Sequence, residues 1–332
     1  MIFHNNAFAA VEVGDCLNTL RQWPDGMAQM CVTSPPYFGL RDYGHDGQIG
    51  LEDTPDAFVA RLVEVFREVR RVLRDDGTLW LNIGDSYART GGSDRKPSPT
   101  ATVGNTLRSM ESMPDRRQRA PTGLKEKDLI GIPWMLAFAL RADGWYLRQE
   151  IIWHKPNPMP ESVTDRCTKA HESLFLLAKS ERYLCDMEAI KEPAVGANLH
   201  DVTGRTKQRG MADTFKRKGS KREQAIPGQS TGTHREDRAD SSYDLYTRNR
   251  RSVWTLATRP YSGAHFAVYP PALIEPCILA GSRPGDIVLD PFGGSGTTAG
   301  AALKHGRSAM LCELNPEYAA LTAERARSIY AA

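Results

Sequence analysis

The chain has 332 residues, of which 40% are hydrophobic, 25% charged and 8% aromatic, with a formal net charge of +3. These values are typical of a globular protein with one large domain or two smaller ones, and they exclude collagen-like, coiled-coil and wholly disordered chains; we expect neither a membrane span nor a signal peptide. The 6 cysteines form no CxxC pair and the chain is too long to need disulfides, so we expect reduced thiols, a cytoplasmic location and no bound metal.

The first part of the chain is expected to hold short strands and one long amphipathic helix. Over residues 54–72, apolar residues recur at helical spacing with charges between them, and an Asp-Gly pair at 76–77 is expected to stop this helix. Short apolar runs predict strands over residues 9–13, 28–33 and 78–83.

The rest of the chain continues this alternation. Helices are expected over residues 130–141, 272–280, 295–304 and 316–329, and strands over 147–153, 173–178, 286–290 and 308–313. Strands that alternate with helices predict an α/β protein, in which a doubly wound, mostly parallel sheet carries helices on both faces. Such sheets bind ligands beyond the carboxyl ends of their strands.

A glycine-rich segment, residues 290–298, lies between a predicted strand and a predicted helix. Gly294 and Gly296 let the backbone approach a ligand closely, and the start of the helix presents unpaired amide groups. Glu313 ends the next predicted strand, where an acid binds the ribose hydroxyls of an adenosine. The segment lacks the Gly-Lys-Ser/Thr of a P-loop, so a P-loop NTPase is not expected. With Glu313 as the ribose-binding acid, we expect an adenosine cofactor, either NAD or S-adenosylmethionine.

The segment Thr-Ser-Pro-Pro-Tyr, residues 33–37, follows another predicted strand. Two consecutive prolines fix the backbone and remove two amide donors. The carbonyl of Pro35 and the hydroxyl of Ser34 are then acceptors beside one another, which suits an N–H-rich partner such as an exocyclic amino group. Tyr37 offers a ring on which a base can stack.

These two segments together resemble the amino-methylating DNA methyltransferases. Their order, catalytic motif first and Asp-Pro-Phe-Gly-Gly-Ser-Gly at 290–296 last, resembles the β class, whose Rossmann-like methyltransferase fold is circularly permuted. The resemblance also covers Val-Gly-Asp-Cys at 13–16, Ile-Ile-Trp-His-Lys-Pro-Asn at 151–157, His-Glu-Ser-Leu-Phe-Leu at 171–176, and the segment 251–270.

The resemblance implies S-adenosylmethionine as the cofactor and assigns a role to individual residues. The catalytic residues would be Ser34, Pro35, Pro36 and Tyr37. The cofactor would contact Asp15, Thr33, Asp290, Phe292, Gly294, Ser295, Gly296, Thr297 and Glu313. Trp153 would form a second wall of the target-base pocket, with a place in the core as the alternative. Cys277 is expected to be a core residue and not a nucleophile.

Two basic segments interrupt the predicted body. Residues 89–128 carry a net charge of +4 and residues 191–251 a net charge of +6, which leaves −7 for the other 231 residues. Both segments are rich in Gly, Pro, Ser and Thr, so they are expected to be mobile insertions, either solvated loops or contacts for the DNA backbone. The family places target recognition in the second, which leaves 1–190 and 252–332 as the catalytic domain. The expected DNA-binding residues are Lys207, Arg209, Lys216, Arg217, Lys218, Lys221 and Arg222.

The function implied is a site-specific DNA methyltransferase that acts on a cytosine flipped out of the duplex and yields N4-methylcytosine. In this family Ser at the first catalytic position, here Ser34, is associated with cytosine and Asp or Asn with adenine, so methylation of adenine is the alternative. More distant alternatives are an NAD-dependent oxidoreductase and a non-enzymatic DNA-binding module. The expected partners are double-stranded DNA and a cognate restriction endonuclease, and the sequence leaves monomer and homodimer open.

Overall fold

The computed structural model describes residues 1–4, 7–39, 47–88, 123–193, 247–258 and 269–330. The chain divides into two compact units, Met1–Ile190 with Arg251–Ala332, and Lys191–Arg250. Most of the two basic segments, including every DNA-binding candidate from Lys207 to Arg222, lies outside the described residues. Within the described ranges, no helix is both long and apolar enough to cross a membrane.

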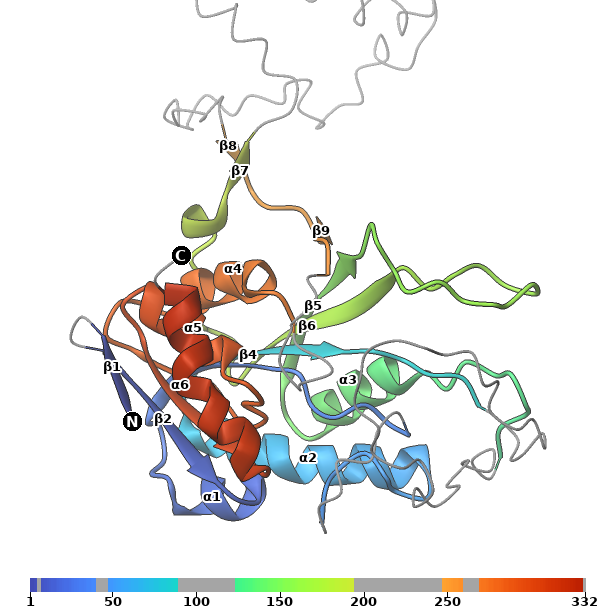
Figure 1. The fold of residues 1–332 in the computed structure, drawn as a ribbon, viewed down its shortest axis with the longest axis horizontal. Coiled ribbons are helices and arrows are strands. Elements are labelled where there is room, and N and C mark those ends of the chain that lie inside the picture. The colour runs from blue at the N-terminus through green and yellow to red at the C-terminus, as the bar shows by residue number, and fades with distance from the viewer. Residues whose placement is uncertain (5–6, 40–46, 89–122, 194–246, 259–268, 331–332) are drawn as a thin grey trace, which may run out of the picture. The chain divides into compact units, whose positions relative to one another are not determined.

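In the larger unit, the described residues form a nine-stranded sheet of order β1-β2-β11-β10-β3-β4-β6-β5-β9 (Figure 1). In this order the strands are Ile2–His4, Ala7–Val13, Ser308–Glu313, Ile287–Asp290, Ala28–Thr33, Leu73–Ile83, His171–Ala178, Tyr146–His154 and Val253–Thr255. From β2 to β4 in this order the strands are parallel to one another, β9 is parallel to β5, and β1 and β6 run in the opposite direction. The predicted mostly parallel, doubly wound sheet is confirmed, whereas the reversal of β6 was not predicted.

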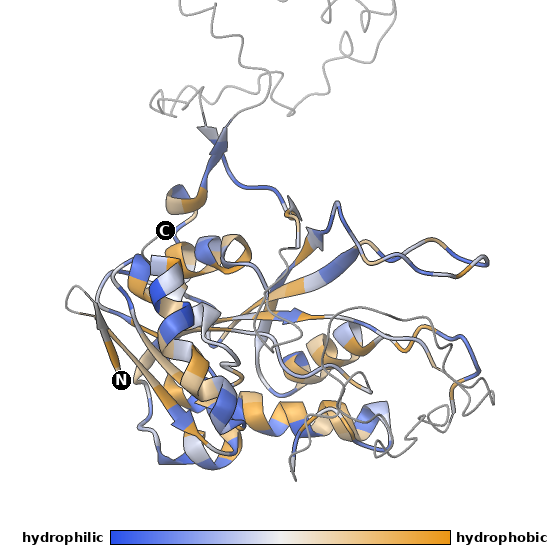
Figure 2. Cartoon of the chain, in the orientation of Figure 1, coloured by the Kyte–Doolittle hydropathy of each residue, from blue (hydrophilic) through white to orange (hydrophobic). Residues whose placement is uncertain are grey.

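The helices cover both faces of this sheet. They are α1 (Cys16–Gln22), α2 (Pro55–Val72), α3 (Ile132–Ala142), α4 (Pro271–Gly281), α5 (Thr297–Lys304) and α6 (Pro316–Tyr330). The first three pack into one apolar core and the last three into another. Side chains of β4 alternate between them, since Leu79 and Leu81 enter the first core and Trp80 the second. Figure 1 shows α2 and α3 on the side of the sheet opposite α4, and Figure 2 shows apolar residues concentrated in the helices and strands.

The long helix α2 has the bounds that its apolar spacing predicted, but it is not the Asp-Gly pair at 76–77 that stops it. Thr54 caps it, with its hydroxyl accepting from the Ala57 amide at 3.1 Å, and Pro55 begins it, as expected. The chain turns at Leu73 directly into β4, so the Asp-Gly pair lies inside a strand. Gly77 is needed there because a Cβ would lie 2.9 Å from the Gln29 carbonyl of β3. The prediction was wrong because it treated this glycine as a helix stop and not as a close approach between strands.

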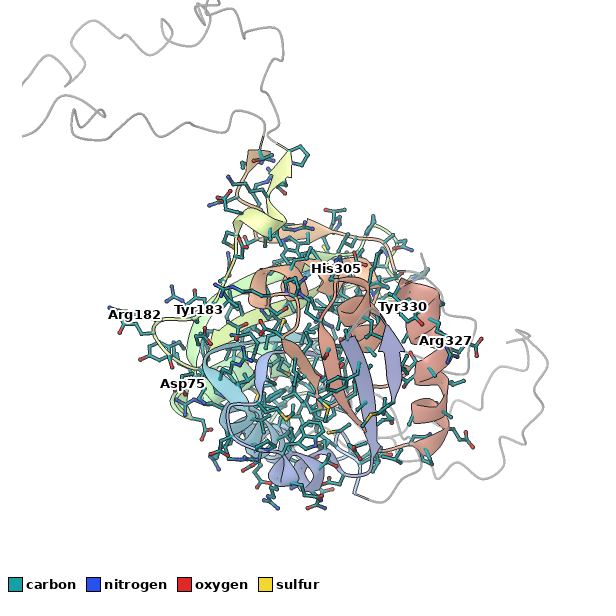
Figure 3. All side chains as sticks on the ribbon, turned by 90° about the vertical axis from the view of Figure 1, so that its left-hand side faces the viewer. Asp75, Arg182, Tyr183, His305, Arg327 and Tyr330 are labelled. Carbon is teal, nitrogen blue, oxygen red and sulfur yellow. The ribbon has the colours of Figure 1, made fainter. Side chains whose placement is uncertain are left out.

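The amino-terminal edge of the parallel strands is polar and well paired. Figure 3 labels Asp75 near the start of β4, Arg182 and Tyr183 beyond the end of the reversed β6, and His305 ahead of β11. An ion pair of 2.8 Å between Arg74 and Asp286 joins the start of β4 to the turn before β10. The predicted ligand-binding motifs all lie at the other, carboxyl-terminal edge.

The smaller unit is described at its two ends only. These pair as the antiparallel strands β7 (Glu192–Pro193) and β8 (Thr247–Arg248), and Arg248 Nε donates to Glu192 Oε1 at 2.9 Å. This pairing closes the base of the long basic segment.

Candidate active site

The sheet order brings together motifs that are far apart in the sequence. Strands β11, β10, β3 and β4 are neighbours and parallel, so the segments after their carboxyl ends share one edge. The glycine segment follows β10 and the Ser-Pro-Pro-Tyr segment follows β3. A hydrogen bond of 2.6 Å from Thr33 Oγ1 to Asp290 Oδ1 joins the two segments directly.

Asp290 organises the start of the glycine segment. Its carboxylate accepts from the hydroxyls of Thr33, Thr298 (2.5 Å) and Tyr269 (3.0 Å), and from the Phe292 amide (3.0 Å). Burial raises the pKa of Asp290, while these hydrogen bonds favour the charged form. Asp290 is 1% exposed and Thr33 is 0% exposed. These side chains hold the loop from inside the protein, and their predicted contact with the cofactor stays a prediction.

The Tyr269 hydroxyl also holds this loop, through its hydrogen bond to Asp290. We expect Tyr269→Phe to weaken S-adenosylmethionine binding by roughly 3- to 10-fold. Loss of one hydrogen bond to a buried charge costs about 1–3 kcal/mol, and part of this cost reduces cofactor affinity because the loop is held less firmly. Calorimetric titration of the cofactor measures the change. Tyr146→Phe, on a tyrosine that is 45% exposed, is the control. Unchanged affinity in Tyr269→Phe would show that the hydroxyl does not shape the binding loop.

The glycine segment has left-handed turns at two glycines and leaves two hydroxyls without a partner among the described residues. Gly294 and Gly296 have φ values of 51° and 87°, in the left-handed region that favours glycine. The Gly294 amide donates to Glu313 Oε2 at 2.7 Å, so the predicted ribose-binding acid contacts the predicted loop. The side-chain oxygens of Ser295 and Thr297 are buried and have no hydrogen-bond partner within the described ranges. Buried hydroxyls are normally paired, so these two are suited to receive polar groups of a ligand.

A cleft of about 350 Å³ lies beside Asp15. Asp15 caps α1 by accepting from the Asn18 amide at 2.8 Å, and Arg61 Nη2 lies 3.9 Å from its other carboxylate oxygen. Leu314, which follows Glu313, lines the same cleft. Of the residues predicted to bind the cofactor, Asp15 is the one that lines this cleft. Glu313 and the buried hydroxyls of Ser295 and Thr297, which have no hydrogen-bond partner within the described ranges, fit the polar groups of S-adenosylmethionine. Phe292 packs edge-on against Phe66, with ring centroids 6.5 Å apart.

The predicted catalytic residues lie beyond β3, next to the end of β4. The Tyr37 ring lies against Gly84, where a Cβ would come within 2.5 Å of the ring. The Tyr37 hydroxyl donates to Glu172 Oε2 at 2.7 Å and accepts from Asn82 Nδ2 at 3.0 Å. Burial, aided by the Glu172 charge, raises the pKa of Tyr37 well above its usual value. Asn82 Nδ2 also donates to Ser34 Oγ at 3.4 Å, so one amide holds both hydroxyls.

Trp153 takes the second of the two places predicted for it, in the core. Its side chain is 3% exposed and belongs to the second core, and its indole N–H donates to the Leu256 carbonyl at 2.9 Å. The Lys155 ammonium lies 4.3 Å from the ring centroid. The ring is therefore a core element and not an open wall for a base. Cys277 is 0% exposed, which confirms its predicted place in the core.

Several site residues were not identified from the sequence, namely Asn82, Gly84, Glu172 and Tyr269. Asn82 could have been identified from the sequence, because it is the one polar residue at the end of an apolar predicted strand. Glu172 and Tyr269 lie inside segments that matched the family, but their partners become evident only when strands far apart in sequence are placed side by side.

A parallel sheet with a glycine loop, an acid on the adjoining strand and unpaired buried hydroxyls defines an α/β enzyme that binds a nucleoside cofactor. The profile of the N6_N4_Mtase family, described as DNA methylase, matches residues 28–324. The type II methyltransferase M.XycI of Xanthomonas campestris pv. cyanopsidis is 47% identical over 94% of this chain and 85% of its own length. M.SmaI of Serratia marcescens, also a type II methyltransferase, is 45% identical over 94% of this chain and 89% of its own.

Solved structures share the fold. The PvuII cytosine-N4-specific DNA methyltransferase superposes with a TM-score of 0.59 at 17% identity, over 98% of this chain and 92% of that one. A Thermus thermophilus protein in complex with S-adenosyl-L-methionine gives a TM-score of 0.56 at 23% identity, over 97% and 94%. The chain belongs to the N6_N4_Mtase family of DNA methylases and is an amino-methylating, S-adenosylmethionine-dependent DNA methyltransferase. Family membership removes the oxidoreductase and non-enzymatic hypotheses.

Proposed function

We propose that this enzyme methylates the exocyclic N4 of a cytosine that is flipped out of double-stranded DNA. The observation that carries the proposal is Ser34, which stands first in the Ser-Pro-Pro-Tyr segment at the carboxyl edge of β3, where the family associates serine with cytosine. The hydroxyl accepts from Asn82 Nδ2 at 3.4 Å, and the carbonyl of Pro35, the next residue, is the second proposed acceptor. Two acceptors at one place match the two N–H groups of an exocyclic amine.

An exocyclic amine is a poor nucleophile because its lone pair is delocalised into the ring. S-adenosylmethionine supplies, when bound, an electrophilic methyl group on a sulfonium. Ser34 Oγ and the Pro35 carbonyl accept the N–H groups of the amine and draw its nitrogen toward tetrahedral geometry, which frees the lone pair. The nitrogen would then bond to the methyl group as the methyl–sulfur bond breaks, leaving the electron pair of that bond on the sulfur, and the methylated nitrogen would release a proton to solvent. Tyr37 stacks on the flipped base, and the fixed acceptors cost little reorganisation during the reaction.

The product identifies the base. DNA methylated by the purified enzyme is digested to nucleosides, and mass spectrometry is expected to show N4-methyldeoxycytidine as the new species. N6-methyldeoxyadenosine as the sole product would overturn the cytosine assignment while leaving the family and the cofactor unchanged. An identical incubation without S-adenosylmethionine is the control.

We also propose that residues 191–251 recognise the target sequence, with Lys207, Arg209, Lys216, Arg217, Lys218, Lys221 and Arg222 contacting the DNA. The net charge of +6 on this segment supports the role, because Lys and Arg side chains neutralise a phosphate backbone. The relatives of this chain are type II methyltransferases, so we propose a restriction endonuclease of the same specificity as a partner in the cell.

Deletion of residues 207–238 is expected to reduce DNA affinity at least about 100-fold and to leave S-adenosylmethionine affinity unchanged, because removing several phosphate contacts costs on the order of 10²–10³ in binding. Fluorescence anisotropy with labelled duplex DNA and calorimetry with the cofactor measure the two affinities. The β7–β8 pair lies outside the deletion and keeps the ends of the segment joined. Unchanged DNA affinity would refute the recognition role.

A further inference from the structure

A half-buried carboxylate, Glu172 on β6, lies behind the predicted catalytic residues. Its side chain is 15% exposed. Oε2 accepts from the Tyr37 hydroxyl at 2.7 Å and from Asn82 Nδ2 at 3.1 Å, and Oε1 receives the Lys155 ammonium. Four different segments of the sheet edge, after β3, in β4, after β5 and in β6, therefore meet at this one carboxylate.

The Asn82 amide can take only one orientation. A carboxylate only accepts hydrogen bonds, so the atom of Asn82 that faces Glu172 is the Nδ2 donor. The same Nδ2 reaches the Tyr37 hydroxyl at 3.0 Å and Ser34 Oγ at 3.4 Å. Glu172 thereby fixes which way the amide faces, and the two N–H groups of the amide are shared among Glu172 and the two hydroxyls.

The stability of the fold does not account for these polar groups. Asn82 is 2% exposed and its Oδ1 is buried with no hydrogen-bond partner within the described part of the chain. A buried unpaired acceptor costs about 1–3 kcal/mol, and a half-buried ion pair such as Lys155–Glu172 adds little stability compared with apolar side chains of the same volume. An apolar residue at position 82 would serve the strand better, so the amide and its carboxylate have another use.

Lys155 holds the carboxylate in place and compensates its charge. Its side chain is 18% exposed, its ammonium also lies 4.3 Å from the Trp153 ring centroid, and its backbone amide donates to the Ala170 carbonyl at 2.8 Å. The buried Trp153 ring, which is not a wall for the target base, is thus part of the support beneath the site.

We propose that Glu172 is a positioning residue for methyl transfer. Through the Tyr37 hydroxyl it fixes the ring on which the target base stacks, and through the Asn82 amide it orients the Ser34 hydroxyl that accepts the N–H of the amine. This inference rests on the roles proposed above for Ser34 and Tyr37, and it holds for a cytosine or an adenine.

The test is Glu172→Gln. An amide has one acceptor atom, so it can satisfy either Lys155 or the Tyr37–Asn82 pair, but not both. We expect kcat to fall on the order of 10- to 100-fold, as for a misplaced reacting group, with S-adenosylmethionine affinity within about twofold of wild type. Glu150→Gln is the matched control, because Glu150 lies on the neighbouring β5 and accepts from Ser173 Oγ at 2.8 Å, away from the catalytic segment. A wild-type kcat in Glu172→Gln would overturn the proposal.

A double-mutant cycle separates positioning from general stability. If Glu172 acts through the Tyr37 hydroxyl, Tyr37→Phe and Glu172→Gln remove the same contact, and the double variant loses no more kcat than the worse single variant. Losses that multiply would overturn this route. Thermal unfolding of each variant shows that the chain is folded.

A pH profile gives a second signature that a purely structural role does not produce. Asn82→Asp sets a second carboxylate beside Glu172, and the like charge raises the pKa of the new acid. Below that pKa the protonated carboxyl of the variant donates to Glu172 as Nδ2 does, so we expect activity at low pH that is lost as the pH rises. A profile identical to wild type would contradict the proposal.

Different results would contradict the catalytic roles of Ser34 and Tyr37 and the positioning role of Glu172. If Ser34→Ala and Tyr37→Ala keep full methylation, the proposed catalytic roles are wrong. If those variants are inactive and Glu172→Gln has wild-type kcat, only the positioning role of Glu172 is wrong.

Discussion

Gly296→Ala is expected to abolish measurable S-adenosylmethionine binding and to lower the free energy of unfolding by roughly 2–5 kcal/mol. Gly296 caps the amino terminus of α5 with a φ of 87°, a conformation that costs energy for any residue with a Cβ. The added Cβ would also lie 2.3 Å from Thr322 Cγ2 and 3.1 Å from Thr322 Cα on α6. The loop cannot yield without moving the hydroxyls of Ser295 and Thr297, so stability and cofactor binding should fall together.

The matched control is Gly285→Ala. Gly285 has nearly the same φ, +89°, but a Cβ there would meet nothing within 4 Å. This variant therefore carries the backbone strain alone, in the turn before β10, away from the cofactor loop. Calorimetry of cofactor binding and of thermal unfolding compares the two. Wild-type cofactor affinity in Gly296→Ala, with no greater loss of stability than in Gly285→Ala, would refute the role of the close contact with Thr322.

The elements of this fold were predictable where the signal is local. Residues 28–33 were predicted as a strand with the bounds that β3 has, because an apolar run ends at two prolines. The reversed direction of β6 was not predictable, since an apolar run such as that at 173–178 has the same pattern in either direction. The start of β4 at Leu73 was missed, because the role of Gly77 inside the strand depends on the Gln29 carbonyl of another strand.

The residues of the candidate site were also predictable where the signal is local, and not where it depends on contacts between distant strands. Ser34, Tyr37, Gly294, Gly296 and Glu313 belong to short contiguous motifs, and the sheet order places these motifs at one edge. Residue type alone does not show which side chains of a motif face a ligand. Thr33 and Asp290 turned inward because their hydrogen bonds to each other and to Tyr269 satisfy them inside the protein. That outcome depends on the pairing of β10 with β3, across more than half of the chain.

The packing of α5 on α6 shows how tertiary contact changes the meaning of a motif. Residues 294–299 read as Gly-x-Gly-x-x-Ala, the dinucleotide-binding pattern, whose last position, here Ala299, is a small residue that allows close helix packing. Within α5 the close approach to α6 comes one residue later, at Gly300, where a Cβ would lie 2.6 Å from Ile329 Cβ and 3.1 Å from Ala326 Cα. The glycine segment is thus fixed at two points against α6, Gly296 and Gly300, and only the first was predicted to matter.

Ser34→Ala and Tyr37→Ala are each expected to lower kcat at least about 100-fold and to leave S-adenosylmethionine affinity within a few-fold of wild type. Ser34→Ala removes one of the two acceptors proposed for the target amine. Tyr37→Ala removes the stacking surface and opens a void beside Gly84, so its stability should also fall, by about 3–5 kcal/mol if the void does not collapse. Single-turnover methylation assays with saturating DNA measure the chemical step.

Tyr37→Phe divides the role of the tyrosine into its ring and its hydroxyl. The ring stays on Gly84 and still offers a face to the base, whereas the hydrogen bonds to Glu172 and Asn82 are lost. We therefore expect base flipping, followed by the fluorescence of 2-aminopurine at the target position, to persist in Tyr37→Phe and to be lost in Tyr37→Ala. Tyr146→Phe and Ser328→Ala, on the start of β5 and on α6, are controls at a distance from the site. Full methylation by Ser34→Ala or Tyr37→Ala would refute the catalytic assignment, because no other hydroxyl or ring among the residues predicted for the target base takes their place.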